Sequence, residues 1–69
     1  MTNLNLTYDV IFNDENDSNS MGFEMTKSEA IDYIKTWNGT DHTYFGDYKG
    51  GIVSVVDSEG EEVYFEEVK

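Results

Sequence analysis

Apolar and polar residues alternate along the first part of the chain, from Leu4 to Phe12. A period of two is typical of a β-strand with one buried face. Only Ile11 breaks the pattern, because it adds an apolar side chain to the polar row. We therefore predict a strand over residues 4–12 with the inward row Leu4, Leu6, Tyr8, Val10 and Phe12.

A second, shorter alternation follows a polar segment. Residues 13–20 contain only Asn, Asp, Glu and Ser, which is typical of a loop. Met21, Phe23 and Met25 then share one side of a short strand, which we expect to pair with the first one. A calcium site in this loop is disfavoured, because a strand precedes it and Ser18 stands where an EF-hand loop needs glycine.

The next segment has the period of an amphipathic helix. Thr26 and Glu29 form a capping box, and Asn38-Gly39 ends the helix, since glycine readily takes a left-handed conformation. A helix of eleven residues is too short to be stable alone, so we expect it to lie on a sheet. The face toward that sheet consists of Ala30, Ile31, Ile34 and Trp37, and we interpret Trp37 as a core residue rather than a ligand-stacking one.

Residues 40–49 have no clear period. Tyr44, Phe45 and Tyr48 indicate either a short strand or an ordered loop packed under the helix. His42 follows Asp41, but neighbours in a loop seldom share a catalytic geometry, and no nucleophile adjoins them. Catalysis is therefore not expected here.

The last twenty residues predict a β-hairpin that organises the fold. Asp57-Ser58-Glu59-Gly60 is typical of a type I turn in which Gly60 is left-handed. We expect two rows of side chains on the hairpin: Val53, Val55, Val63 and Phe65 inward, and Glu62, Tyr64 and Glu66 outward. The whole chain then reads as one α+β domain, residues 1–69, in the order strand, strand, helix, strand, strand. One extra short strand is the alternative.

Composition excludes several kinds of site. The chain has no cysteine and a single histidine, so a disulfide or a thiolate zinc site is ruled out, and we expect no metal and no cofactor. No secretion signal or membrane span is recognisable, which favours a cytoplasmic protein.

Charge is the most informative property. Fifteen acidic residues against four lysines give a net charge of −11. Direct binding to nucleic acid or to an anionic membrane is disfavoured, because both depend on basic residues. The charge indicates either a strongly solvated surface or a basic partner.

The closing hairpin is the candidate binding site. Glu62 and Glu66 lie about 13 Å apart along a strand, and carboxylates spaced this way resemble the phosphates of a nucleic-acid backbone. Such a surface suits a basic protein or nucleoprotein complex that itself binds nucleic acid. The predicted partner-binding residues are Asp57, Glu59, Glu61, Glu62, Tyr64, Glu66 and Glu67.

In its size, its lack of cysteine and proline, its capped helix from Thr26 and its acidic strand over residues 61–67, the chain resembles small acidic proteins of phages and mobile elements, anti-CRISPR proteins and other nucleic-acid mimics among them. The resemblance implies a non-enzymatic inhibitor that blocks the DNA- or RNA-binding groove of a host defence complex in the host cytosol. The alternative is a small acidic accessory or regulatory protein that acts through protein–protein contacts. Such a protein could be a monomer, or a homodimer formed through an exposed edge strand.

Overall fold

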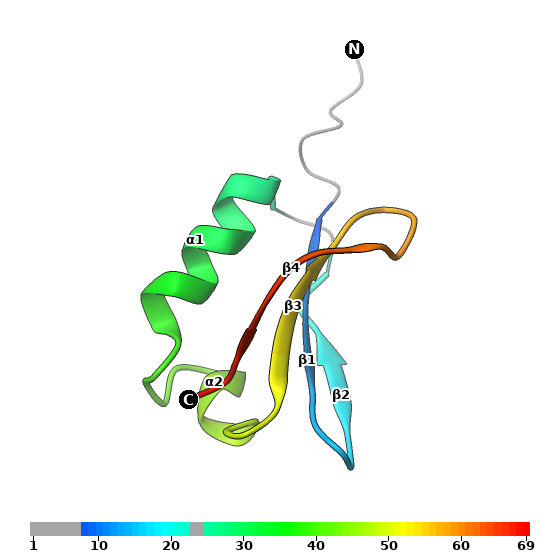
Figure 1. The fold of residues 1–69 in the computed structure, drawn as a ribbon. Coiled ribbons are helices and arrows are strands. Elements are labelled where there is room, and N and C mark those ends of the chain that lie inside the picture. Colours follow the sequence, from blue (N-terminus) through cyan, green and yellow to red (C-terminus); the bar gives the residue numbers. More distant parts are fainter. Residues whose placement is uncertain (1–7, 23–24) are drawn as a thin grey trace.

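The computed structural model describes residues 8–22 and 25–69. Four strands form one antiparallel sheet in the order β2-β1-β3-β4, with one main helix, so the predicted α+β class is confirmed. Both helices lie on the same side of the sheet, and the other face is left open (Figure 1). The elements are β1 (Asp9–Asn13), β2 (Ser18–Ser20), α1 (Lys27–Trp37), α2 (Tyr44–Asp47), β3 (Ile52–Val56) and β4 (Glu62–Glu67).

The core lies between the sheet and the two helices. Phe12 is at its centre, with the Phe45 ring edge-on at a centroid distance of 4.9 Å. Aromatic residues each bury a large area, which compensates for the small number of residues available. The fully or almost fully buried set is Val10, Phe12, Ala30, Ile34, Phe45, Tyr48, Val53, Val55 and Val68.

β1 has the predicted facing. Val10 and Phe12 are fully buried, and Tyr8 packs against the core from the half-buried position before them. Ile11, on the opposite face, is half-buried. Residues 4–7 of the predicted strand lie outside the described residues.

The second strand occupies Ser18–Ser20, so it is shorter and lies earlier in the chain than the strand predicted over residues 21–25. The turn before it is tight: Asp14 Oδ1 accepts from the backbone N–H groups of Asn16 and Asp17, both at 2.8 Å. These bonds close the turn within four residues, so the chain reverses direction early and residues 18–20 pair with β1. Part of the polar segment that was predicted as a loop is therefore a strand. Within the predicted strand over 21–25, the described residues form an isolated bridge between Met25 and Tyr8 and a backbone hydrogen bond from Met21 N–H to the Val10 carbonyl oxygen. Phe23 and Glu24 lie outside the described residues.

α1 agrees with the prediction at both ends. Thr26 and Glu29 exchange the two hydrogen bonds of a capping box. Asn38 caps the C-terminus, and Gly39 follows with φ +96°, a conformation that favours glycine. Residues 44–47 form the single helical turn α2, so the alternative of a further strand there is wrong.

The closing hairpin forms as predicted, but the row assigned inward on β4 is wrong. The turn hydrogen bond runs from Gly60 N–H to the Asp57 carbonyl oxygen at 3.0 Å, and Gly60 has φ +84°. On β3, Val53 and Val55 are fully buried as expected. On β4, however, Val63 is 37% and Phe65 is 58% exposed.

The cause is the register between the two strands. Val55 pairs with Tyr64, whereas Val56 pairs with Glu62, so Val63 is the extra residue of a β-bulge. Residues directly opposite each other point to the same face of a sheet, so Tyr64 shares the helix side with Val55. Val68, 1% exposed, supplies the apolar side chain that Val63 and Phe65 were expected to supply.

Asp9 is the one buried charged residue among the described ones, at 3% exposure. Its carboxylate accepts from the backbone N–H groups of Gly22, at 2.7 Å, and Met21, at 3.2 Å. These bonds tie the segment after β2 to the sheet.

We predict that Asp9→Ala lowers the free energy of unfolding by about 1–2 kcal/mol, because the half-buried N–H of Gly22 loses its acceptor and that of Met21 keeps only the Val10 carbonyl oxygen. Asp9→Asn keeps one acceptor oxygen and is expected to cost less. Urea unfolding at pH 7 measures both variants. Equal losses for the two would contradict the assigned role of the Asp9 oxygen.

Candidate functional site

The structure places all seven predicted binding residues on one hairpin. Three lie in the turn between β3 and β4, and the others lie on β4. They differ in exposure: Glu59, Glu61, Glu62 and Glu67 are exposed, whereas Asp57, Tyr64 and Glu66 are half-buried.

Asp57 has a structural role in the turn. Its Oδ1 accepts from the backbone N–H groups of Glu59 and Glu61, both at 2.9 Å. These bonds hold the turn closed and direct the two following carboxylates outward. The exposed side chains of Glu59 and Glu61 remain available at the tip of the hairpin.

Glu62, Tyr64 and Glu66 do not form the single outward row that was predicted. Glu62 Oε2 accepts from Ser54 Oγ at 2.8 Å, on the open face of the sheet. Tyr64 and Glu66 instead pair with Val55 and Val53, which point toward the helices. The bulge at Val63 separates the two groups, because it breaks the alternation between Glu62 and Tyr64.

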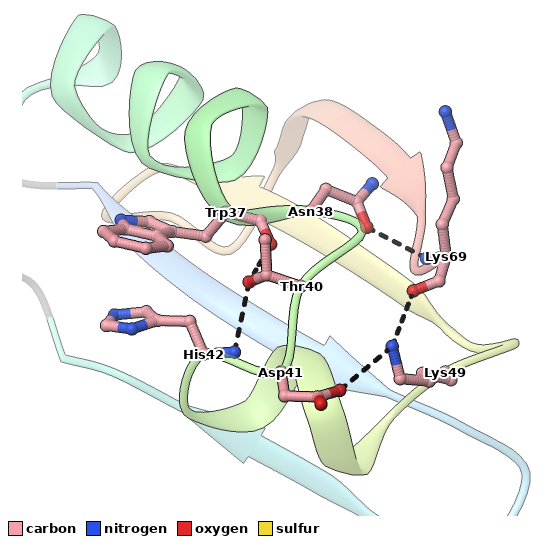
Figure 2. Close-up of polar contacts among 7 residues, drawn as sticks. All are labelled: Trp37, Asn38, Thr40, Asp41, His42, Lys49 and Lys69. Atoms are coloured by element: carbon pink, nitrogen blue, oxygen red, sulfur yellow. Dashed lines mark hydrogen bonds and ion pairs between the residues drawn. The ribbon is translucent and has the colours of Figure 1, made fainter.

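Glu66 belongs to a network that fastens β4 to the end of α1. Its Oε1 accepts from Asn38 Nδ2 at 2.9 Å, and its other oxygen accepts from the Tyr64 hydroxyl. Asn38 Nδ2 also donates to the Glu67 carbonyl oxygen at 2.8 Å. Figure 2 shows the third bond of this amide, from the backbone N–H of Lys69 to Asn38 Oδ1, at 2.9 Å. Asn38 therefore closes the helix and clamps the last strand.

In the loop between α1 and α2, His42 and Asp41 contact different residues. In Figure 2 the rings of His42 and Trp37 lie face to face, with centroids 3.9 Å apart. Asp41 instead forms an ion pair with Lys49 Nζ at 3.3 Å. Trp37 also packs against the core, in agreement with its interpretation as a core residue.

Two acidic side chains of the polar turn between β1 and β2 accept hydrogen bonds within the fold. Asp14 is used to close the turn, and Asp17 Oδ2 accepts from the Tyr48 hydroxyl at 2.9 Å. A hollow lies beside this turn, bordered on the other side by residues 49–52. Among the described residues, no three His, Cys, Asp or Glu side chains are grouped to hold a metal ion.

Charge is segregated between the two layers of the fold. The two hairpins, residues 9–20 and 52–67, contain ten of the fifteen acidic residues and no lysine or arginine. Their two acidic turns lie at opposite ends of the sheet (Figure 1). The basic residues all lie outside the strands and their turns: Lys27, Lys35, Lys49 and Lys69. The sheet layer therefore carries acidic residues at both of its turns and along β4, and no basic residue.

Phe65 is the surface residue that the sequence analysis missed. Its side chain belongs to the open face, because Phe65 pairs with Ser54, and Ser54 pairs with Ile11 on β1. One feature of the sequence could have indicated that Phe65 faces outward: Val68 is apolar and lies in the same alternating row as Tyr64 and Glu66. In the structure Val68 is buried, so this row faces the core.

Neither helix in the described part of the chain is long and apolar enough to cross a membrane. Comparison with known proteins identifies no relatives: no family model, no curated protein and no solved structure matches the chain.

The network around Glu66 predicts a pH-dependent contribution to stability. Burial raises the pKa of Glu66, but hydrogen bonds from Tyr64 and Asn38 outweigh it, so the pKa lies below the ordinary value of 4.5. Two nearby lysines, Lys69 and Lys35, act in the same direction. A lowered pKa means that the stabilisation is present above pH 4.5 and is lost as the pH falls through the pKa of the folded state.

We predict that Glu66→Gln lowers the free energy of unfolding at pH 7 by about 1 kcal/mol, because its hydrogen bonds with Asn38 and Tyr64 lose the charged acceptor. The loss is small because solvent screens this half-buried group. The difference from the parent chain should shrink between pH 7 and an acid pH below the lowered pKa of Glu66 in the folded state, where the carboxyl group is protonated. Urea unfolding at the two pH values measures it, with Glu67→Gln on the exposed face as the matched control. A loss of the same size at both pH values would show that the charge of Glu66 is not what stabilises the contact.

Proposed function

We propose that this chain is a non-enzymatic inhibitor that mimics the charge of nucleic acid and blocks the DNA- or RNA-binding groove of a host defence complex, in the manner of anti-CRISPR proteins. It would act in the cytosol of the host cell. The partner is a basic protein or nucleoprotein complex, and the chain itself neither binds nucleic acid nor requires a cofactor.

The observation that carries this proposal is the segregation of charge. A general solubility role needs only a high net charge, which can be spread over the whole surface. Here every lysine lies outside the two hairpins, so the strands and their turns present carboxylates and no cation of their own to a basic groove, with Lys35 and Lys69 near them at Glu66. Such complementarity speeds association and selects partners with a positive surface.

The hairpin also fixes the backbone positions from which its carboxylates project. Glu59 and Glu61 stand on a turn that Asp57 closes, and Glu62 is hydrogen-bonded to Ser54. A rigid arrangement loses little conformational entropy on binding, so more of the electrostatic attraction contributes to affinity.

A second proposal is a small accessory or regulatory protein of a mobile element that acts through ordinary protein–protein contacts. The exposure of Phe65, 58%, favours it, because large apolar residues on a surface are typical of interface anchors. This protein would bind its partner without competing with nucleic acid.

We predict that the chain displaces a fluorescent DNA target from a purified RNA-guided nuclease loaded with its guide, and that this displacement weakens steeply between about 50 and 200 mM salt. Fluorescence anisotropy of the DNA measures it. Binding to the nuclease without displacement of DNA would favour the accessory role.

The double variant Glu59→Lys, Glu61→Lys tests which surface is responsible. We expect it to lower the affinity for the nuclease roughly tenfold or more, since four units of charge change at one exposed turn. The matched control is Asp32→Lys, Asp47→Lys, which makes the same change in net charge on the exposed surface of the two helices. If the two double variants bind equally weakly, net charge rather than the hairpin determines binding.

A further inference from the structure

β4 is an edge strand with a neighbour on only one side, β3. An edge strand carries a row of outward N–H and C=O groups that can pair with another chain. Which residues carry them follows from the ladder, because hydrogen-bonded and non-hydrogen-bonded pairs alternate along antiparallel strands.

The alternation directs the backbone of Phe65 outward. Just beyond the end of β4, the N–H of Val68 donates to the Gly51 carbonyl oxygen at 2.9 Å, so residues 66 and 64 also face β3. Residues 65 and 67 then face away from the sheet. The bond from Asn38 Nδ2 to the Glu67 carbonyl oxygen agrees with this, since it approaches β4 from outside the sheet. At Phe65 the edge is therefore open.

The side chain of Phe65 lies beside this open edge. It is 58% exposed on the face of the sheet without helices, and Ile52, on the neighbouring strand of the same face, is 37% exposed. Ser54 lies directly opposite Phe65, and half-buried Ile11 follows in the same row across the sheet. An exposed aromatic next to unpaired backbone groups provides both an anchor and a pairing strand.

The charges of β4 determine what can pair with it. Three of its six residues are glutamates, and it has no basic residue. A second copy of the chain would bring three more carboxylates against them, and like charges across a ladder destabilise pairing. An extended segment with lysine or arginine at alternate positions would instead place cations beside these carboxylates.

We propose that the outer edge of β4 at Phe65 binds an extended basic segment of the partner by adding it to the sheet as a fifth strand. The backbone of Phe65 supplies hydrogen bonds, its ring supplies the apolar contact, and the exposed Glu62 and Glu67 of β4 select for positive charge. The inference deepens the proposed function, on which it rests, by naming the form in which the basic partner is recognised.

A defined probe for this site is a capped hexapeptide of alternating lysine and valine, titrated into the ¹⁵N-labelled full chain. We expect shift changes at the amides of Phe65 and Glu67. The same peptide N-methylated at every residue keeps its charges but cannot pair as a strand. It should bind at least tenfold more weakly.

Two proline variants form a matched pair. Phe65→Pro removes an outward N–H, which an edge strand tolerates, and should weaken binding of the unmethylated peptide tenfold or more. Ser20→Pro is the control on the other edge: Met21 N–H donates to the Val10 carbonyl oxygen, so the N–H of Ser20 also faces outward. Ser20→Pro should leave binding unchanged. Phe65→Ala, which keeps the N–H, should lose roughly fivefold, as expected for a removed apolar anchor.

Equal binding of the methylated peptide, or shift changes confined to residues 57–61, would overturn the edge site and leave only charge attraction. The outcome is separable from the test of inhibition. If the nuclease assay fails but the peptide binds at Phe65, the inhibitor function falls and the edge site stands. If the nuclease is inhibited but the peptide binds elsewhere, the inhibitor function stands and the edge site at Phe65 is wrong.

Discussion

The register of β4 against β3 determines both the core and the surface of this protein. Because Val55 pairs with Tyr64, the helix-facing row of β4 consists of Tyr64, Glu66 and Val68. Val68 completes the apolar core, while Glu66 reaches Asn38 at the end of α1. A register shifted by one residue would turn Phe65 toward the core and Val68 toward solvent. It would also break the hydrogen bonds between Asn38, at the end of α1, and the last strand.

Two polar side chains fasten segments of the fold to each other, and one of them, Asn38, supports that register. Asn38 binds the backbone of Glu67 and Lys69, so the chain end cannot slide along β3. Asp9 binds the backbone of Met21 and Gly22 and holds the segment between β2 and α1. A domain of 69 residues has a small core, and such side chain–backbone bonds add specificity where apolar burial is limited.

The same constraint creates the proposed binding surface. The bulge at Val63 puts Glu62 on the open face with Phe65, while Tyr64 and Glu66 turn toward the helices. An exposed carboxylate, Glu62, and an exposed aromatic ring, Phe65, therefore lie on the same face of β4, which is an edge strand. All four lysines lie outside the two hairpins, so the proposed basic partner would meet mainly carboxylates on the strands and their turns. The charges would then guide association, and the edge would fix the orientation of the complex.

The sequence alone determined the α+β class, the boundaries of α1, the facing of Val10 and Phe12 and the turn at Gly60, because local rules govern periodicity, caps and turns. Only the tertiary structure decided the rest. The row Val63, Phe65, Glu67 and the row Tyr64, Glu66, Val68 each hold two apolar residues and one glutamate, so alternation cannot choose between them. The choice depends on the pairing with β3 and on Asn38, about thirty residues away in the sequence. β2 escaped prediction for a similar reason, since Ser18–Ser20 has no apolar pattern and is held as a strand by its turn and its pairing with β1.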